Sequence, residues 1–265
     1  FTWSSPSNIA LVKYWGKKQD QIPENPSISF TLDNCKTTTT LSFSKKVSDT
    51  DYSFEVFLDG EKKDDFKPKI ETFFKRIQAY LPFLKDYHFK IETVNTFPHS
   101  SGIASSASGM SALALCLMSI EKEQVDAISK EKFIRKASFL ARLGSGSACR
   151  SLEGDLVVWG AHDKIEGSSD LFGAKYPYEV HQDFKNYQDT ILLVDKGEKR
   201  VSSSVGHNLM FGHPFAKERF IQANNNLSSM ISILKEGDLD GFIALVEHEA
   251  LTLHAMMMTS MPYFI

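Results

Sequence analysis

The sequence has few cysteines, little excess charge and no long apolar run, and each absence argues against a class of protein. Its three cysteines, Cys35, Cys116 and Cys149, lack the spacing of a metal or redox motif. A formal net charge of −3 gives no broad attraction to nucleic acid. The apolar run from Ala112 to Met118 is far shorter than the ~20 residues of a membrane span. We therefore expect a cytoplasmic protein that binds neither nucleic acid nor membrane.

Signatures of several enzyme classes are also missing. No G-x-S-x-G turn is present to hold a strained serine nucleophile, which makes a serine hydrolase a weak option. No G-x-x-x-x-G-K-[ST] loop is present, so a Walker A nucleotide site is excluded. No cluster of His, Cys and carboxylate residues has the intervals of a metal site built from side chains.

Both ends of the sequence are unusual. The start, "FTWSSP", has neither an initiator methionine nor the basic and apolar regions of a signal peptide. The end, "MPYFI", is an apolar tail directly after a predicted helix. We expect that the natural polypeptide is longer than these 265 residues.

Hydrophobic periodicity predicts an α+β protein with a mixed first part and a helical second part. We expect domains at 1–190 and 191–265, the second one incomplete. Strands are predicted at Thr37–Phe43, Phe54–Leu58, Tyr87–Thr93, Leu156–Trp159 and Thr190–Val194. Helices are predicted around Ile70–Leu81, Met110–Ile120 and Phe133–Leu140, and from Phe215 onward, with a stop at Gly237 and a cap at Asp238 or Asp240.

The segment "PHSSGIASSASG" (Pro98–Gly109) has almost no side-chain bulk. Nine of the ten residues from Ser100 to Gly109 are Ser, Gly or Ala. It lies between a predicted strand and a predicted helix, where unpaired N–H groups can meet phosphate oxygens closely. The alternative is a helix start that packs tightly against a sheet, and the segment alone does not decide between the two.

Three further segments could carry chemistry. "NIALVKYWGKK" (Asn8–Lys18) combines a tyrosine and two lysines near a glycine turn, which suits binding of a phosphate. The alternative is a solvated lysine pair that binds no ligand. "GSGSACRS" (Gly144–Ser151) places one arginine among small residues, which suits a carboxylate ligand or a structural ion pair. "KRVSSSVGH" (Lys199–His207) could be a second phosphate-contacting turn, but a polar loop is the favoured interpretation.

Together these segments resemble one family. P-x-x-x-G-I-A-S-S-A at Pro98–Ala107 resembles the second motif of the GHMP kinase superfamily. "NIALVKYWGK", "GSGSACRS", "KRVSSSVG" and "LHAMMMTSMPYF" are similar, in order and separation, to diphosphomevalonate decarboxylases. The resemblance implies a GHMP kinase-like two-domain α+β fold. It also implies ATP-dependent conversion of (R)-5-diphosphomevalonate to isopentenyl diphosphate, with release of ADP, phosphate and carbon dioxide, in the mevalonate pathway.

The resemblance also implies roles for particular residues. Arg150 would hold the substrate carboxylate, with Asn8 orienting it, and Arg150 and Lys17 would be catalytic. The substrate diphosphate would be held by Tyr14, Lys17, Ser202 and Ser203. ATP would be bound by Ser101, Gly102, Ala104, Ser105 and Ser106, and Ser106 would also meet the magnesium ion. A homodimer is common in the family.

The sequence departs from the family pattern in two places. Pro26 stands in "NPSISF" where many relatives have serine, which puts a substrate contact there in doubt. The family's catalytic aspartate lies in a later "DAG"-like segment, which does not occur before Ile265. Two alternatives therefore stay open: a related GHMP kinase or decarboxylase acting on mevalonate or a phosphomevalonate, and a non-catalytic nucleotide-binding homologue.

Overall fold

In the computed structural model, the long strand β2 (Ser27–Lys45) contributes residues to both of the compact units into which the chain divides. The chain divides into two compact units, Phe1–Asn8 with Thr31–Glu153, and Ile9–Phe30 with Gly154–Ile265. The structure describes residues 1–47, 49–98, 102–125, 127–186, 188–192 and 203–264, and only the backbone of residues 203 and 204.

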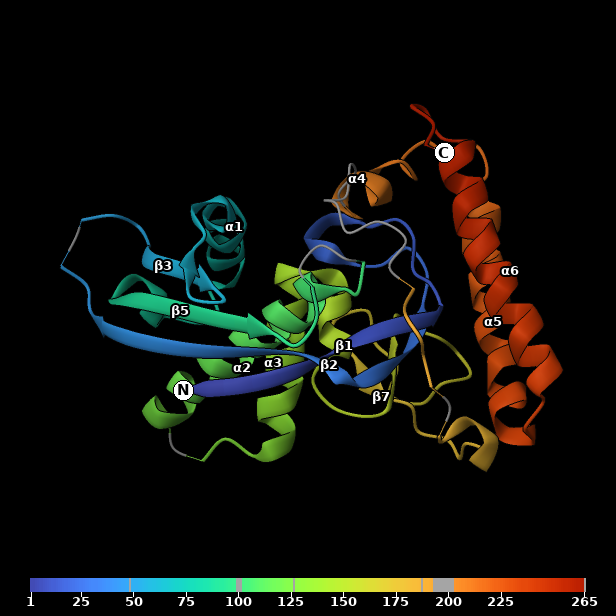
Figure 1. The fold of residues 1–265 in the computed structure, drawn as a ribbon, viewed down its shortest axis with the longest axis horizontal. Helices are drawn as coiled ribbons and strands as arrows, with labels where there is room; N and C mark the ends of the chain where they lie inside the picture. Colours follow the sequence, from blue (N-terminus) through green and yellow to red (C-terminus); the bar gives the residue numbers. More distant parts are fainter. Residues whose placement is uncertain (48, 99–101, 126, 187, 193–202, 265) are drawn as a thin grey trace. The chain divides into compact units, whose positions relative to one another are not determined.

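Figure 1 shows the chain as a ribbon and labels its α-helices and most of its strands. The strands are β1 (Thr2–Val12), β2, β3 (Ser53–Leu58), β4 (Glu61–Lys62), β5 (Tyr87–Asn95), β6 (Leu156–Trp159) and β7 (Ala174–Lys175). The helices are α1 (Lys67–Ile77), α2 (Ser105–Gln124), α3 (Lys130–Gly144), α4 (Ser203–Asn208), α5 (Ala216–Glu236) and α6 (Leu239–Met258). Short 3₁₀ helices are η1 (Gln19–Gln21), η2 (Asp64–Phe66), η3 (Pro82–Lys85), η4 (Gly146–Arg150) and η5 (Gln182–Phe184).

The first unit is a sheet covered by helices α1, α2 and α3. Strand β5 pairs antiparallel with β2 and parallel with β3, and the register places Leu41 and Val56 beside Ile91. These three side chains are buried with apolar residues of the three helices in one core. Thirteen of the 20 residues of α2 are buried, because its Ala and Ser positions let it pack closely on several sides. The N-terminus of α2 is therefore anchored firmly.

The second unit combines a small antiparallel sheet with two long helices. The start of β2 pairs with β6, and β6 pairs with β7. Helix α5 ends at Gly237, whose φ of 78° is the left-handed conformation that glycine adopts without strain. Asp238 caps α6, since its side chain accepts a hydrogen bond from the Gly241 N–H group at 2.9 Å.

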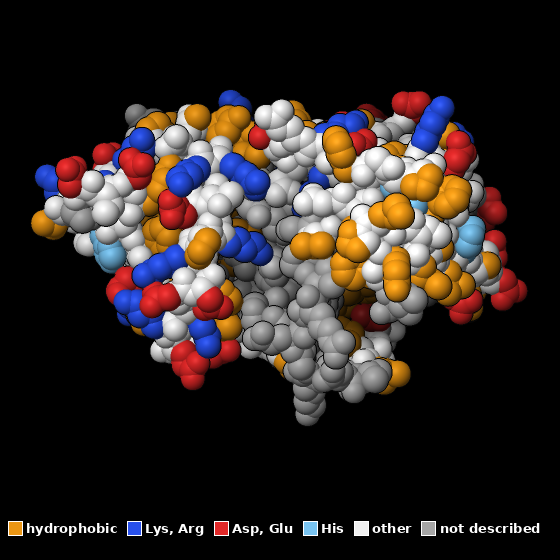
Figure 2. Space-filling model, turned by 90° about the horizontal axis from the view of Figure 1, so that it is seen from above, with side chains coloured by type: hydrophobic (Ala, Val, Ile, Leu, Met, Phe, Trp, Pro, Cys, Tyr) orange, Lys and Arg blue, Asp and Glu red, His pale blue; other side chains and the backbone are white. Residues whose placement is uncertain are grey.

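Helix α6 is strongly apolar, yet few of its side chains are fully buried. Only Glu249 and Met256 are buried among its 20 residues, and Leu251 is 67% exposed. In Figure 2 apolar side chains gather over the part that carries the C-terminal helices, whereas the other part carries mixed lysine and acidic side chains. The described residues include no helix that is both long and apolar enough to cross a membrane.

Most predicted elements are confirmed, and the mixed α/β character is as expected. The predicted strand at 190–194 is wrong for residues 190–192, which form no strand; the rest lies outside the described residues. The favoured polar loop at 199–207 is wrong for its last part, because Ser203–Asn208 form α4. The domain boundary near residue 190 stays a prediction.

Candidate functional site

A buried polar cluster in the first unit joins β1 to η4. The Arg150 Nε group donates to Asn8 Oδ1 at 3.3 Å, and the two residues are only 2% and 4% exposed. The Asn8 Nδ2 group donates to the Ser151 Oγ atom at 2.7 Å and to the Ser147 carbonyl at 3.2 Å. The guanidinium is thus oriented by a neutral amide whose own position is fixed. Such a group can bind a carboxylate with two parallel hydrogen bonds.

A buried thiol lies beside this guanidinium. Burial raises the pKa of Cys149 to about 12, although the positive charges of Arg150 and Arg142 favour the thiolate. The Cys149 Sγ group donates to the Gly146 carbonyl at 3.0 Å. A thiol in this state is neutral at physiological pH and unreactive. Cys149 is therefore a packing residue of the cluster.

The loop before α2 has an unusual backbone. Gly102 has a φ of 90°, and Ala104, the residue that caps α2, has a φ of 53°. For alanine this left-handed conformation costs about 1–2 kcal/mol, so the surrounding structure must hold it. The Ala104 carbonyl accepts from the Ala107 N–H group at 2.8 Å, and the Ser7 hydroxyl donates to the Ile103 carbonyl. The loop enters the helix at a fixed angle, with Ser105 and Ser106 in its first turn.

A cavity of about 170 Å³ lies in the first unit, between the sheet and helices α1 and α2. Apolar side chains form much of its lining, and hydroxyl groups line it along β2 and β5. The Thr37 hydroxyl donates to Asn95 Oδ1 at 2.6 Å and lies 2.6 Å from the Ser108 hydroxyl. The Thr39 and Thr93 hydroxyls are 3.0 Å apart. A mainly apolar cavity with a few fixed polar groups is typical of a small-molecule site.

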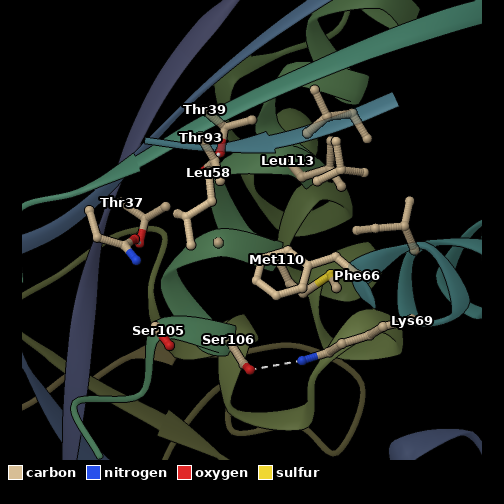
Figure 3. A pocket seen from close by; sticks show the side chains of 15 residues that line it. Thr37, Thr39, Leu58, Phe66, Lys69, Thr93, Ser105, Ser106, Met110 and Leu113 are labelled. Carbon is tan, nitrogen blue, oxygen red and sulfur yellow. Dashed lines mark hydrogen bonds between the residues drawn. The ribbon is translucent and has the colours of Figure 1, made fainter. Parts of the chain in front are cut away.

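Lys69 connects this cavity to the start of α2. Figure 3 shows its side chain extending from α1 to Ser106, where its ammonium group donates to the Ser106 hydroxyl at 2.8 Å. Desolvation by neighbouring groups lowers the pKa of Lys69, although the residue as a whole stays exposed. The ammonium group and the helix N-terminus are both positive. Their juxtaposition suits an anion at the rim of the cavity.

The second unit holds an aromatic cluster around His207. The Tyr14 ring stacks on the His207 ring at 4.5 Å and meets Trp159 edge-on at 4.6 Å. The Gly16 N–H group donates to His207 Nδ1 at 3.2 Å, which fixes the imidazole. Lys17 lies over Tyr14, with its ammonium group 6.0 Å from the ring centroid. Tyr14 and Lys17 thus lie together, in the same unit.

The structure places only some of the predicted site residues. Asn8 lies against Arg150, and Ser105 and Ser106 begin α2 as expected. Ser101 and Ser202 lie outside the described residues, and Ser203 is described only as the first backbone residue of α4. The proposed roles of all these residues remain predictions.

Sequence analysis missed two polar residues of the first unit. Ser151 stands in the sequence only as the last residue of the Gly144–Ser151 segment, yet it contacts Asn8 directly. Lys69 lies in an ordinary amphipathic helix, and its contact with Ser106 spans 37 positions. No local pattern marks such a contact, because the fold alone brings these two residues together.

Comparisons with known proteins agree with the resemblance. A family profile described as the diphosphomevalonate decarboxylase-like N-terminal domain matches residues 5–171. The diphosphomevalonate decarboxylase of Rattus norvegicus is 29% identical over 281 residues, which cover 98% of this chain and 65% of that protein. The diphosphomevalonate decarboxylase ERG19 of Gibberella zeae is 32% identical over 268 residues, which cover 95% of this chain and 67% of that protein. This chain therefore spans about two thirds of the length of these relatives.

Solved structures give the same result. A structure described as MDDEF in complex with MVAPP, AMPPCP and magnesium has a TM-score of 0.79 and 27% sequence identity to this chain. The match covers 99% of this chain and 76% of that one. The likeness therefore extends over both units.

Proposed function

Because this chain belongs to the diphosphomevalonate decarboxylase-like family, we propose that the protein converts (R)-5-diphosphomevalonate to isopentenyl diphosphate with consumption of ATP. The family profile covers residues 5–171, and the Gibberella zeae relative is similar over 95% of the chain. The observation that carries the proposal is the buried Arg150 guanidinium, which Asn8 orients within the first unit. The reaction would belong to the mevalonate pathway of isoprenoid biosynthesis.

The proposed reaction has two chemical stages. The 3-hydroxyl oxygen attacks the γ-phosphorus of ATP, its proton passes to a base, and ADP leaves. The C3–O bond then breaks with its electron pair on the departing phosphate, the C1–C2 bond supplies the electrons of the new double bond, and the carboxylate leaves as carbon dioxide. Positioning and charge stabilisation are the main contributions of a protein to such a reaction. We assign the base to no residue of this chain.

We propose that Arg150 binds the substrate carboxylate. Its Nε atom is held by Asn8, and a carboxylate can be bound through the Nη edge, which Asn8 does not use. Burial keeps water away from the contact and strengthens it. We further propose that Tyr14 and Lys17, with Ser202 and Ser203, hold the diphosphate.

We propose that ATP binds at the cavity and at the start of α2. The nucleoside would enter the cavity, and the phosphates would meet Gly102, Ala104, Ser105, Ser106 and the Lys69 ammonium group. The described residues contain no group of three His, Cys or acidic side chains that could hold a metal. Magnesium would therefore be held by phosphate oxygens, water and the Ser106 hydroxyl, which suits an ion that retains several waters. When bound, it neutralises charge on the phosphates.

The relative described as MDDEF supports this assignment, since it was solved with AMPPCP and magnesium. A matched pair of variants tests the cavity. A Cβ atom added at Gly109 would meet nothing closer than Thr37 Cγ2 at 4.0 Å. Gly109→Ala should therefore leave ATP binding intact, whereas Gly109→Leu should fill the cavity and weaken ATP binding at least tenfold by isothermal titration. Equal ATP affinity in both variants would contradict the cavity as the nucleoside site.

A coupled assay tests the reaction itself. The complete gene product is given ATP, magnesium and 5-diphosphomevalonate, and ADP and carbon dioxide are followed together. We expect equal amounts of both products, and their loss in Arg150→Ala. ADP without carbon dioxide would indicate a kinase relative, and neither product with ATP still bound would indicate a non-catalytic homologue.

We also propose that the protein works in the cytoplasm. Cys35, Cys116 and Cys149 are all free thiols, and free thiols persist where disulfides are kept reduced. A fluorescent fusion expressed at the native level provides the test. Signal in a secretory compartment would contradict this location.

A further inference from the structure

Ser151 directly follows the motif arginine and is completely buried. Its side chain is 0% exposed, and its Oγ atom accepts a hydrogen bond from the Asn8 Nδ2 group at 2.7 Å. This is a shorter contact than the 3.3 Å bond between Asn8 and Arg150. Nothing in the family resemblance assigned a role to this serine. Its short contact with Asn8 indicates that it helps to hold the Asn8 amide in place.

The amide of Asn8 has one possible orientation. The Ser147 carbonyl can only accept, and it faces the Nδ2 group at 3.2 Å. The Arg150 Nε group can only donate, and it faces the Oδ1 atom at 3.3 Å. A flipped amide would place a carbonyl against a carbonyl and an N–H group against an N–H group. The Ser151 hydroxyl completes this arrangement by accepting the second Nδ2 hydrogen.

Ser151 is itself held from two sides. Its carbonyl accepts from the Ser111 hydroxyl on α2 at 3.0 Å, and its N–H group donates to the Ala148 carbonyl at 3.0 Å. Ser111 is also 0% exposed. The buried helix α2 therefore fixes Ser151, Ser151 fixes the Asn8 amide, and the amide fixes the Arg150 guanidinium. Buried polar groups with all partners satisfied are rigid.

We propose that Ser151 is a positioning residue for carboxylate binding, which acts on Arg150 through Asn8. This inference rests on the proposed function, because the carboxylate is that of 5-diphosphomevalonate. Without the Ser151 hydroxyl, the Asn8 amide keeps its orientation but loses its shortest contact, so the longer bonds to the Ser147 carbonyl and Arg150 hold it less firmly in place. The guanidinium plane then loses its alignment with the carboxylate. Since the proposed diphosphate ligands are Tyr14, Lys17, Ser202 and Ser203 and do not include Asn8, the effect should be confined to ligands that carry the carboxylate.

Two ligands and two variants test the proposal. Affinities for 5-diphosphomevalonate and for isopentenyl diphosphate, which lacks the carboxylate, are measured by titration calorimetry on the complete gene product. Ser151→Ala should weaken binding of 5-diphosphomevalonate about tenfold and change that of isopentenyl diphosphate less than twofold. Ser119→Ala is the matched control, because it removes a different buried hydroxyl, on α2, which accepts from the Trp3 Nε1 group at 2.8 Å and donates to the Leu115 carbonyl at 3.0 Å. It should leave both affinities unchanged.

The outcomes separate this proposal from the proposed function. Thermal unfolding of both variants shows whether the fold survives the substitution. If the wild-type protein binds 5-diphosphomevalonate and Ser151→Ala binds it equally well, the positioning role is wrong while the proposed function stands. An equal loss for both ligands would also overturn the role, since it would indicate general damage to the fold. If the wild-type protein does not bind 5-diphosphomevalonate, the proposed function fails, and the positioning role fails with it.

Discussion

Both units bury arginine side chains, but different groups hold the guanidinium ions of Arg150 in the first unit and Arg219 in the second. In the second unit, Arg219 on α5 bonds both carboxylate oxygens of Glu249 on α6, at 2.8 and 2.7 Å, and both side chains are 0% exposed. The Lys13 carbonyl accepts a further bond from Arg219 at 2.9 Å. In the first unit, the Arg150 Nε group is held by the neutral amide of Asn8.

The difference separates a structural role from a ligand-binding role. A carboxylate neutralises the charge of Arg219, and the pair joins α5, α6 and the segment after β1. Each ion of that pair is neutralised by the other. The Asn8 amide orients Arg150 without contributing a negative charge of its own, which is compatible with binding of an anionic ligand. Burial of an arginine alone therefore does not identify a site, whereas the group that orients it helps to do so.

The largest loss of stability is expected when the Arg219–Glu249 ion pair of the second unit is broken. Glu249→Leu leaves the Arg219 guanidinium buried without its carboxylate. We expect the free energy of unfolding to fall by about 3–5 kcal/mol, measured by urea denaturation. A loss below 1 kcal/mol would mean that water reaches Arg219, and the contrast between the two arginines would disappear.

A double variant sharpens this test. Arg219→Met with Glu249→Leu removes both charges and puts apolar groups in their place. Because desolvation of the two ions is then avoided, the double variant should recover at least half of the stability lost in Glu249→Leu. The remainder reflects the Lys13 backbone groups and the Asn226 amide, which lose their partners.

The next effect concerns ligand binding by the first unit. Arg150→Lys keeps the positive charge but loses both the Nε contact with Asn8 and the planar fork that matches a carboxylate. We expect kcat/KM for 5-diphosphomevalonate to fall about 100-fold, with a smaller loss of unfolding free energy than in Glu249→Leu. If stability falls more than in Glu249→Leu, Arg150 is as structural as Arg219.

A smaller effect is the pH dependence of the second-unit pair. Burial raises the pKa of Glu249, but the hydrogen bonds and charge of Arg219 outweigh it and hold the pKa below its ordinary value of 4.5. The carboxylate therefore stabilises the fold fully above that value, and this contribution is lost as the pH falls through the lower folded pKa. The unfolding free-energy difference between wild type and Glu249→Gln should be constant at neutral pH and shrink in acid. A constant difference down to pH 2 would contradict the assignment.

The sequence predicts the arginine of the first unit as a site residue, but it does not predict the buried ion pair of the second unit. Arg150 stands in a motif of small residues, and the start of α2 follows from a strand, a small-residue loop and a helical period. Arg219 and Glu249 are 30 positions apart and lie on different helices, so no local sequence pattern predicts their ion pair. The predicted strand at residues 190–192 failed because a short run of apolar and β-branched residues cannot show whether a partner strand is available. Residue-level patterns thus predict elements and motifs, whereas contacts such as Lys69–Ser106 depend on the tertiary fold.

The smallest effect concerns the thiol next to Arg150. If the guanidinium dominated its surroundings, Cys149 would be acidic; burial instead raises its pKa to about 12 and that of Cys116 to about 11. At pH 8 only about one Cys149 in 10⁴ is then a thiolate, the reactive form. With a thiol-specific reagent we expect the half-buried Cys35 to react in the native protein and the other two only after denaturation. Rapid modification of Cys149 in the native protein, located by mass spectrometry, would show that water reaches the surroundings of Arg150. Arg150 and Arg219 would then differ in their solvent exposure, and not only in the groups that hold them.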